Sequence, residues 1–249
     1  MEILKNGAAK LGVELSRKQL EQFSTYYREL VAWNQRLNLT TITGYREVQT
    51  KHFLDSLTVL LVCPDMTGEE KNRVIDIGTG AGMPGLPLKI VFPGIRLTLL
   101  DATFKKSIFL RHLVQQLEME NVEILVDRAE EAAHSSEYRQ RFDLVLSRAV
   151  APLVTLAELT LPFCAIGGNF IAMKKGNLGP EISQAVGAIE TLGGELGGVK
   201  MVPLEELPDE RQLVVIHKTA ETPPQYPRRP GRPDKRPLTG NEVDKRFGE

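Results

Sequence analysis

This sequence of 249 residues has few cysteines and no long apolar run. These two absences limit the classes of protein to which it can belong. Cys63 and Cys164 are isolated, so we expect neither a disulfide framework nor a zinc cluster, and no metal. The longest aliphatic stretch is a few residues within 57–62, far short of the ~20 needed to cross a bilayer. The first residues have no signal-peptide core. We therefore expect a cytoplasmic protein without a membrane partner.

Composition and charge indicate a globular chain with a basic end. With 42% hydrophobic and 25% charged residues, the sequence is ordinary for a soluble protein and long enough for one large α/β domain plus a small addition. The net charge of −1 hides an asymmetry, because residues 222–249 carry seven Lys or Arg and four Asp or Glu. This segment is net +3 and the other 221 residues are net −4. Such a distribution is typical of a protein that meets a polyanion at one face.

Hydrophobic periodicity predicts alternating strands and helices in the middle of the chain. The predicted strands are 73–77, 96–100, 122–126, 142–147, 166–173 and 211–217, and the predicted helices are 83–92, 104–119, 152–161 and 178–191. This alternation favours a parallel sheet covered on both faces. Four glycines within 193–198 predict a turn before residues 200–202, which would pair with 213–217 as a closing hairpin. The sheet would then have one antiparallel strand.

The two ends of the chain are predicted to differ from this central domain of residues 71–221. Residues 1–70 indicate a helical extension, in which Ser16 caps one helix with Gln19 as its capping-box partner. A second helix is predicted from about residue 45 to 62, stopped by Pro64. Residues 222–249 are rich in proline and have no apolar period, so we expect an extended basic tail without a core of its own.

The turn after the first predicted strand is the most informative segment. Residues 74–85 read VIDIGTGAGMPG, which is a short apolar strand, a glycine turn and the start of a helix. Glycines allow a positive φ and let a ligand lie directly on the backbone. A P-loop is excluded, because no Gly-x-x-x-x-Gly-Lys-Ser/Thr run exists.

Two cofactor classes use such turns, and the neighbouring residues favour one of them. Gly80, Gly82 and Gly85 fit the dinucleotide fingerprint, and Asp101 follows about 20 residues later to hold a ribose. Asp76 argues against a pyrophosphate, because a carboxylate beside the turn would repel it. The same carboxylate suits a cationic ligand with a sulfonium and an ammonium group. The pattern resembles the first two motifs of class I S-adenosylmethionine methyltransferases; a nicotinamide or flavin enzyme and a turn without a ligand remain as alternatives.

The carboxyl ends of the predicted strands give an expected order of ligand contacts. Ligands of parallel sheets lie at those ends. In this chain the ends are residues 78–83, Asp101, residues 127–130 and the pair Ser147-Arg148. In a methyltransferase they would hold the methionine part, the ribose, the adenine and the substrate side, in that order.

The sequence lacks the residues that several nucleic-acid methyltransferases use to activate an acceptor. The Asn/Asp-Pro-Pro-aromatic run of exocyclic-amine enzymes is missing after Ser147, and neither cysteine follows a proline as the nucleophile of carbon-5 pyrimidine enzymes typically does. What remains is an acceptor that is already nucleophilic, and guanine N7 fits because it needs no deprotonation. Catalysis would then be positioning plus electrostatics. We assign no catalytic residue, and Arg148 is the one candidate.

Several segments together resemble one family over roughly residues 20–238. They are Asn38-Leu-Thr40, His52-Phe-Leu-Asp55-Ser56, residues 76–85, Leu100-Asp101 with Lys105-Lys106, Arg128-Ala-Glu130, Ser147-Arg-Ala149, Met173-Lys-Lys-Gly176, Arg211 to Ile216 and the tail from Tyr226 to Leu238. This combination resembles the RsmG (GidB) family of bacterial small-subunit ribosomal RNA methyltransferases, which methylate a guanine N7. The glycine motif is shared by the whole class, whereas the combination is specific.

The resemblance implies an α/β fold of the class I S-adenosylmethionine-dependent type: a Rossmann-like, mostly parallel seven-stranded sheet with one antiparallel strand and an N-terminal helical extension. It also implies S-adenosyl-L-methionine as cofactor. With the glycine turn included, the expected cofactor-binding residues are Asp76, Gly78, Gly80, Gly82, Met83, Asp101, Ala102, Thr103, Ala129, Glu130 and Arg148. Two of them depart from the family: Met83 stands where members often have Phe, and Ala102 stands where members often have Ser.

The resemblance further implies 16S rRNA of the small ribosomal subunit as the substrate, and charge predicts where the RNA binds. We expect contacts at Lys105, Lys106, Arg111, Lys174, Lys175, Arg228, Arg229 and Arg232. Phosphate neutralisation would make this binding strongly salt dependent. The target base must be presented from a loop or lifted from its stack. We expect a monomer, and a non-catalytic S-adenosylmethionine-binding ribosome-assembly factor remains as the alternative function.

Overall fold

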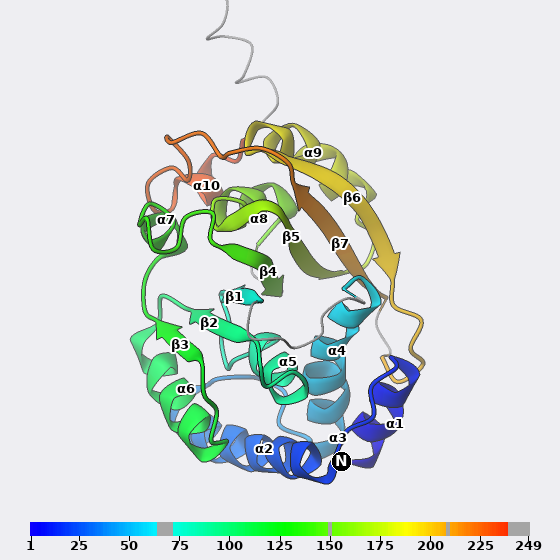
Figure 1. Ribbon diagram of the computed structural model, residues 1–249. Coiled ribbons are helices and arrows are strands. Elements are labelled where there is room, and N and C mark those ends of the chain that lie inside the picture. The colour runs from blue at the N-terminus through cyan, green and yellow to red at the C-terminus, as the bar shows by residue number, and fades with distance from the viewer. Residues whose placement is uncertain (64–71, 149–150, 208–209, 239–249) are drawn as a thin grey trace, which may run out of the picture.

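The computed structural model describes residues 1–63, 72–148, 151–207 and 210–238 (Figure 1). Three sequence expectations fall outside these ranges: the helix stop at Pro64, the last residue of the Ser147-Arg-Ala149 motif, and the part of the tail after residue 238. Within the described ranges, no helix is both long enough and apolar enough to cross a membrane.

The N-terminal region is helical, as the sequence predicts. Its elements are α1 (Glu2–Lys10), α2 (Arg17–Leu37), α3 (Tyr45–Glu47), a π-helical turn η1 (Val48–Leu54), α4 (Asp55–Leu57) and a 3-10 turn η2 (Thr58–Leu61). The capping box at the start of α2 is confirmed, because the Ser16 side chain accepts from the Gln19 backbone and the Gln19 side chain accepts from the Ser16 backbone. The run from α3 to η2 is continuous and corresponds to the predicted second helix.

The sheet has seven strands in the order β3-β2-β1-β4-β5-β7-β6. The strands are β1 (Arg73–Ile77), β2 (Arg96–Leu100), β3 (Val122–Leu125), β4 (Phe142–Arg148), β5 (Cys164–Lys175), β6 (Gly194–Met201) and β7 (Arg211–Lys218). The pairs from β3 through β5 are parallel, and β7 runs antiparallel to both of its neighbours. The predicted mostly parallel sheet with one antiparallel strand is confirmed.

Helices cover both faces of the sheet (Figure 1). The further helices are α5 (Gly85–Val91), α6 (Phe104–Gln116), α7 (Ala129–Ala132), α8 (Leu153–Thr160), α9 (Gly179–Thr191) and α10 (Arg232–Lys235). In Figure 1, α5, α6 and the N-terminal helices lie below the sheet, and α7 to α10 lie above it. Successive residues of a strand point to opposite faces, so Val74 joins the lower core and Ile75 the upper one.

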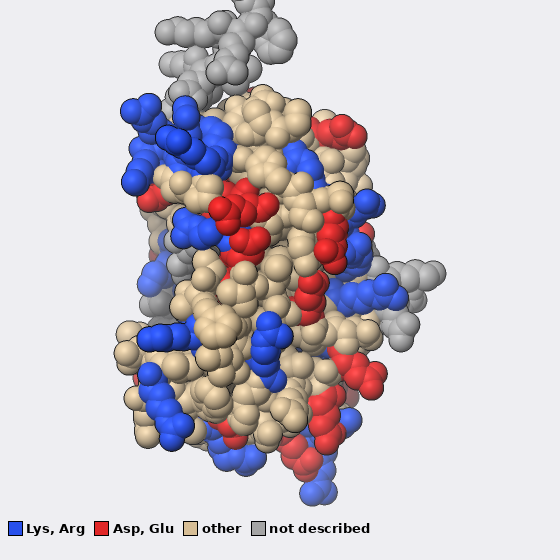
Figure 2. All heavy atoms as spheres, turned by 90° about the vertical axis from the view of Figure 1, so that its left-hand side faces the viewer, with Lys and Arg blue, Asp and Glu red and all other residues tan. Residues whose placement is uncertain are grey.

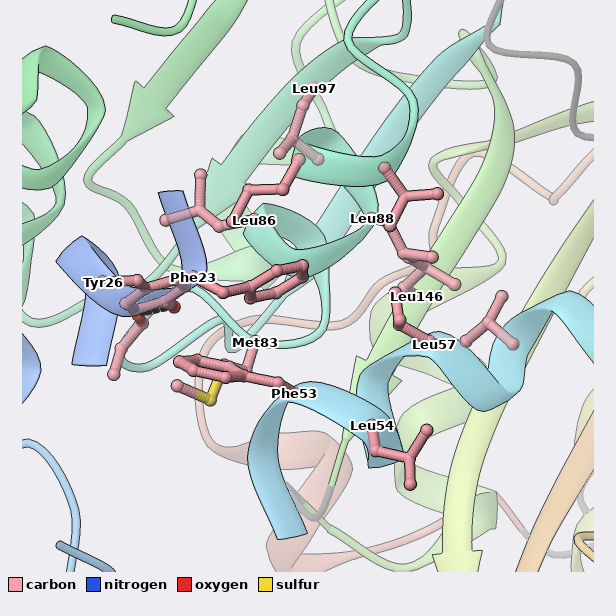
Figure 3. Packing of buried hydrophobic residues seen from close by; sticks show 14 of the residues in the cluster. Phe23, Tyr26, Phe53, Leu54, Leu57, Met83, Leu86, Leu88, Leu97 and Leu146 are labelled. Carbon is pink, nitrogen blue, oxygen red and sulfur yellow. Dashed lines mark hydrogen bonds between the residues drawn. The ribbon is translucent and has the colours of Figure 1, made fainter. Parts of the chain in front are cut away.

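The lower core contains aromatic side chains from the N-terminal helices. The ring of Phe53 from η1 lies 5.0 Å from the rings of both Phe23 and Tyr26 of α2. Figure 3 shows these rings beside Leu86 of α5 and beside Met83. All three rings are fully buried. The N-terminal extension therefore shares one hydrophobic core with the sheet domain.

The glycine-rich stretch before β7 differs from the prediction. It was expected to be a turn, but β6 already begins at Gly194. A Cβ atom at Gly197 would collide with the His217 ring of β7, so the missing side chain lets the two strands approach. The register shifts between Leu196 and Gly198 as at a β-bulge. Glycine at this position allows two strands to pack closely, whereas the prediction assumed the common role of glycine in turns.

The described part of the tail also differs from the prediction, because it packs on the sheet domain. Leu238 is buried in the upper core, and Pro227 and Pro233 are buried as well. The backbone carbonyls of Tyr226 and Pro227 accept hydrogen bonds from Arg139 and His134. We call residues 226–238 the strap. The strap contacts α8 and the segment after α7, both of which are far away in the sequence. Local periodicity in the sequence does not reveal contacts between such distant segments.

Candidate active site

A pocket of 570 Å³ lies at the carboxyl ends of the parallel strands. Its wall is formed by Ile77, Gly78, Leu100, Asp101, Ala102, Lys106, Asp127, Arg128, Ala129, Glu130, Arg148, Ala151, Thr155, Leu159, Gly231, Pro233 and Asp234. The wall combines the ends of β1, β2 and β4 with α7, α8 and the strap. This is the edge of the sheet at which ligands of open α/β folds bind.

The glycine turn after β1 is shaped by its own backbone and by α2. Gly78 and Gly80 adopt φ values of 71° and 60°, which side-chain-bearing residues rarely do. Gly82 has a φ of 96°, and a Cβ there would lie 2.9 Å from the Tyr26 hydroxyl. That hydroxyl donates a 2.6 Å hydrogen bond to the Ala81 carbonyl. The turn is therefore clamped from below by the N-terminal extension.

Asp76 lies beneath the turn and is fully buried. Its Oδ2 accepts hydrogen bonds from the Thr79 hydroxyl at 2.7 Å and from the Gly85 amide at 2.9 Å. The carboxylate thus joins the start of the turn to the start of α5. Asp76 is not on the pocket wall, and its hydrogen bonds hold the turn, so its expected contact with a cationic ligand stays a prediction.

The other carboxylate oxygen of Asp76 has a different environment. Oδ1 is buried and accepts no hydrogen bond in the structure. Burial also raises the pKa of Asp76 to about 6, against the opposing hydrogen bonds from Thr79 and Gly85. An unpaired carboxylate oxygen in a buried site is costly. A cationic donor placed near Oδ1 would relieve this cost.

Asp101 forms the wall at the end of β2. Its Oδ2 accepts from the Gly80 amide and from the Lys106 ammonium group, both at 3.0 Å, and its Oδ1 accepts from the Thr103 amide at 2.9 Å. Two backbone amides therefore fix the orientation of the carboxylate. Ala102 lies beside it on the wall. This arrangement presents a rigid acceptor of the kind that binds a pair of ribose hydroxyls.

Glu130 of α7 connects the pocket to the strap. Its Oε1 accepts from the Gly231 amide at 2.9 Å and from the Arg128 guanidinium at 3.3 Å. Gly231 has a φ of 75°, and Gly231, Pro233 and Asp234 complete this side of the wall. The strap is thus part of the pocket, which the sequence analysis did not predict.

Arg148, the last residue of β4, lies between this pocket and a second one of 410 Å³. The second pocket is lined by Ile42, Lys51, His52, Asp55, Thr58, Arg148, Met173, Lys174, Lys175, Glu181, Arg211, Gln212 and Leu213. Asp55 of α4 holds Arg148 through a 3.1 Å ion pair with its Nη1 and faces Arg211 Nε at 3.2 Å. The Arg148 Nη1 also donates to the Lys51 carbonyl. Arg148 is therefore fixed at the junction of the two pockets.

His52 is a neutral polar group in the wall of the second pocket. Burial, together with the nearby cations of Arg148 and Arg211, lowers the pKa of His52 to about 4. One ring nitrogen lies 2.9 Å from the Thr40 hydroxyl, and the other lies 3.2 Å from the Lys51 carbonyl. His52 and Asp55 are thus held in the wall beside Arg148, which gives a structural reason for the His-x-x-Asp pattern.

Comparison with known proteins identifies the family. The family described as rRNA small subunit methyltransferase G matches residues 19–214. The protein of that name from Dehalococcoides mccartyi (strain ATCC BAA-2100 / JCM 16839 / KCTC 5957 / BAV1) is 51% identical over 238 residues, covering 96% of this chain and 100% of that protein. This chain belongs to the rRNA small subunit methyltransferase G family. The earlier resemblance is thereby confirmed.

Two further comparisons agree with the family and the fold. Ribosomal RNA small subunit methyltransferase G from Pelotomaculum thermopropionicum (strain DSM 13744 / JCM 10971 / SI) is 45% identical, covering 95% of this chain and 98% of that protein. The ribosomal protein L11 methylase of Lactobacillus delbrueckii subsp. bulgaricus has a similar structure, with a TM-score of 0.50 at 14% identity. That match covers 67% of this chain and 79% of the other and supports the fold alone.

The site fits S-adenosylmethionine, the cofactor of this methyltransferase family. The orphaned Asp76 Oδ1 suits an ammonium donor, the open backbone at Gly78 suits the methionine part, and Asp101 suits the ribose hydroxyls. Ala129 and Glu130 lie on the wall where the adenine is expected. The Ala102 departure leaves its backbone on the wall without a hydroxyl.

Several expected cofactor residues are not on the pocket wall. Met83 is 4% exposed and packs in the lower core near Phe53 and Tyr26 (Figure 3). Gly82 also packs against Tyr26, and Thr103 turns its amide to Asp101. Gly80 reaches the site through its hydrogen bond to Asp101. These residues shape the pocket from behind, and motif matching cannot separate such support from direct contact.

The basic residues expected to bind RNA fall into two groups. Lys105, Lys175, Arg229 and Arg232 are exposed, as is Arg111 farther along α6. Lys106, Lys174 and Arg228 are engaged by acids, with ion pairs to Asp101, Glu181 and Glu158, respectively. The Arg228 side chain is only 13% exposed and the Glu158 side chain 1%. In the structure Arg228 anchors the strap to α8, and its contact with RNA stays a prediction.

Four exposed cations gather on the strap. Arg229, Arg232, Lys235 and Arg236 surround a hollow on the outer side of the strap. Figure 2 shows the face that lies on the left in Figure 1, with Lys and Arg crowded near its top. A cluster of exposed Lys and Arg side chains such as this one attracts polyanions. Among the described residues, no group of three or more His, Cys, Asp or Glu has the geometry of a metal site.

Proposed function

We propose that this chain transfers a methyl group from S-adenosylmethionine to the N7 of a guanine in 16S rRNA of the small ribosomal subunit. The observation that carries the proposal is the position of Arg148, which lines both the cofactor pocket and the second pocket. A base in the second pocket would meet the cofactor beside this residue. Family membership supports ribosomal RNA as the source of that base.

The chemistry needs little from the protein beyond placement. S-adenosylmethionine supplies an electrophilic methyl group on a sulfonium. The N7 lone pair of the guanine forms the new C–N bond as the C–S bond breaks, leaving a neutral thioether and a positively charged base. No proton has to be removed from N7, so a general base is not required. Holding the reacting atoms in line accounts for most of the rate enhancement in such a site.

The residues of the second pocket suit a guanine that arrives with its phosphates. Lys51, Lys175 and Arg211 provide positive charge, while Asp55 and Glu181 offset part of it. The neutral His52 offers a hydrogen-bonding group that does not repel the cationic product. We infer that Lys105, Lys106 and Arg111 bind flanking phosphates, and that the protein acts as a cytoplasmic monomer.

Transfer of labelled methyl groups to small ribosomal subunits that lack the modification tests this proposal. Chain cleavage specific for N7-methylguanine locates the label. We expect one labelled guanine in 16S rRNA. Label in another RNA, or at another atom of the base, would contradict the proposal. Cofactor binding without transfer to naked 16S rRNA, assembly intermediates or finished subunits would favour the non-catalytic assembly factor.

A further inference from the structure

The strap has two faces that belong to different sites. Its inner face contributes Gly231, Pro233 and Asp234 to the wall of the cofactor pocket. Its outer face contributes Arg229, Arg232, Lys235 and Arg236 to a basic hollow of 550 Å³. Gly231 lines both, and Arg229 and Arg232 are near neighbours in the chain. Because both faces share this short backbone segment, a change in the conformation of one face also changes the position of the other.

The ends of the strap are tied to the sheet domain. Arg228 donates to Glu158 from Nε at 2.9 Å, from Nη2 at 2.6 Å and from its backbone amide at 2.7 Å. The Thr155 hydroxyl donates to the Pro233 carbonyl at 3.4 Å, and Leu238 is buried in the upper core. These anchors fix where the strap lies, whereas the residues between them carry the two faces.

The middle of the strap holds several cations close together on a turn and the short helix α10. Arg228 Nη2 donates to the Arg236 carbonyl at 2.7 Å, and the Arg232 amide donates to the Arg229 carbonyl at 3.1 Å. The four basic side chains that surround the hollow repel one another. An anion among them would remove this repulsion and favour the closed turn. The same closed turn points the Gly231 amide at Glu130.

We propose that the outer face of the strap binds a backbone phosphate of the RNA substrate, and that this binding tightens the cofactor pocket whose wall the inner face forms. The proposal rests on the proposed function for the identity of the polyanion. It makes the strap a coupling element: RNA raises the affinity for S-adenosylmethionine, and the cofactor raises the affinity for RNA by the same factor, because linkage between two binding sites is reciprocal.

Calorimetric titration of the full chain with S-adenosylmethionine, with and without a saturating short oligouridylate, tests this coupling. Oligouridylate presents phosphates but contains no guanine to be methylated and no adenine to compete for the pocket. We expect the dissociation constant of the cofactor to fall about 5-fold when oligouridylate is bound, near the lower end of typical couplings. An unchanged dissociation constant at saturation would overturn the proposal.

Charge-removal variants locate the effect. The double variant Arg229→Gln with Arg232→Gln should bind oligouridylate more weakly and lose the coupling, while its cofactor affinity without RNA stays within about 2-fold, since neither side chain lines that pocket. The control, Lys18→Gln with Arg96→Gln, removes two exposed cations on α2 and at the amino end of β2. Coupling that persists in the strap variant, or is lost in the control, would contradict the proposal.

The result of the coupling experiment can be distinguished from the result of the methyl-transfer experiment that tests the proposed function. Coupling by oligouridylate without methyl transfer to any small-subunit RNA would keep the strap proposal and reject the enzyme. Transfer of methyl to 16S rRNA with no coupling in the calorimeter would keep the enzyme and reject the strap proposal.

Discussion

The glycine turn and the strap both shape the cofactor pocket, but they are held in different ways. The turn lines the pocket at Gly78, and the strap lines it at Gly231, Pro233 and Asp234. Residues 78–85 are fixed by backbone hydrogen bonds and by the buried Asp76, which lies only a few residues away in sequence. The strap is fixed by a buried ion pair between Arg228 and Glu158, which are 70 residues apart. The turn is tightly held because Gly82 and Gly85 leave no room for a side chain and Asp76 joins Thr79 to Gly85. The strap depends on a few anchors, so it is the wall that a partner is able to influence.

The largest effect is expected from Gly82→Ala in the glycine turn. The new Cβ would lie 2.9 Å from the Tyr26 hydroxyl in a backbone with a φ of 96°. Strain and overpacking together should lower the free energy of unfolding by about 3 kcal/mol and abolish measurable cofactor binding. Thermal denaturation and calorimetry measure both. Gly12→Ala is the control, because Gly12 has a φ of 80° but no neighbour within 4 Å. Equal losses in the two variants would mean that backbone strain alone, and not overpacking against Leu86 and Tyr26, matters.

Glu158→Gln should release the strap while leaving the turn intact. Removing the carboxylate charge breaks the ion pair between Glu158 and the largely buried Arg228, which we expect to cost about 2 kcal/mol after the strap relaxes into water. The cofactor affinity should fall about 30-fold, with little change in the main unfolding transition. Glu190→Gln on the exposed side of α9 makes the same chemical change and should have no effect. Wild-type affinity in the Glu158 variant would show that the strap is no part of the cofactor site.

The pH dependence of cofactor affinity should come from the turn and not from the strap. The raised pKa of Asp76, about 6, means that the free protein holds a proton there below pH 6. An ammonium donor requires the ionised form, so affinity should fall about 10-fold per pH unit below pH 6 and be level just above it. The variant Asp76→Asn should bind more weakly and without this slope. A wild-type affinity that is constant from pH 5 to 7 would contradict the role given to Oδ1.

The same raised pKa predicts how stability changes with pH. In the unfolded chain Asp76 releases its proton near its ordinary pKa of 3.8, whereas in the folded protein it does so near 6. The stability linked to this proton is therefore fully present below pH 3.8 and lost as the pH rises through 6. Denaturant titrations of wild type and Asp76→Asn isolate this contribution. A difference between the two that does not change between pH 4 and 6 would contradict it.

The smallest effect is expected from Asp55→Asn, which affects neither wall directly. The carboxylate holds Arg148 at the junction of the two pockets, so its loss should lower kcat for methyl transfer about 5-fold, while the cofactor affinity stays within about 2-fold. Glu47→Gln, which removes an exposed ion pair with Lys51 nearby, serves as the control. A cofactor affinity that falls together with kcat would mean that Asp55 supports the cofactor pocket and not the junction.

Sequence predicts well those features that depend on neighbours in the chain. The strands β1 and β2, the capping box at Ser16 and the glycine turn all follow from periodicity or from short motifs. The carboxyl ends of parallel strands meet at one edge, so Gly78, Asp101, Glu130 and Arg148 could be assigned to one pocket before the structure was known.

Sequence predicts poorly the features that depend on contacts between distant segments. The sequence gives no sign that Glu158 lies beside Arg228, or that Met83 packs near Phe53 and Tyr26. Asp55 and Arg148, the two ends of the junction ion pair, are 93 residues apart. A buried partner changes what a charged or apolar side chain does, and no local pattern reveals that partner.

The most direct test of the two-walled pocket is amide hydrogen exchange with and without S-adenosylmethionine. Peptides covering residues 76–85 and the strap are compared in the same experiment, with α9 as an internal reference. Both walls should gain protection when the cofactor binds, and the Gly231 amide, which donates to Glu130, should slow with them. Protection confined to residues 76–85, with the strap exchanging as fast as before, would contradict the claim that the strap closes the cofactor site.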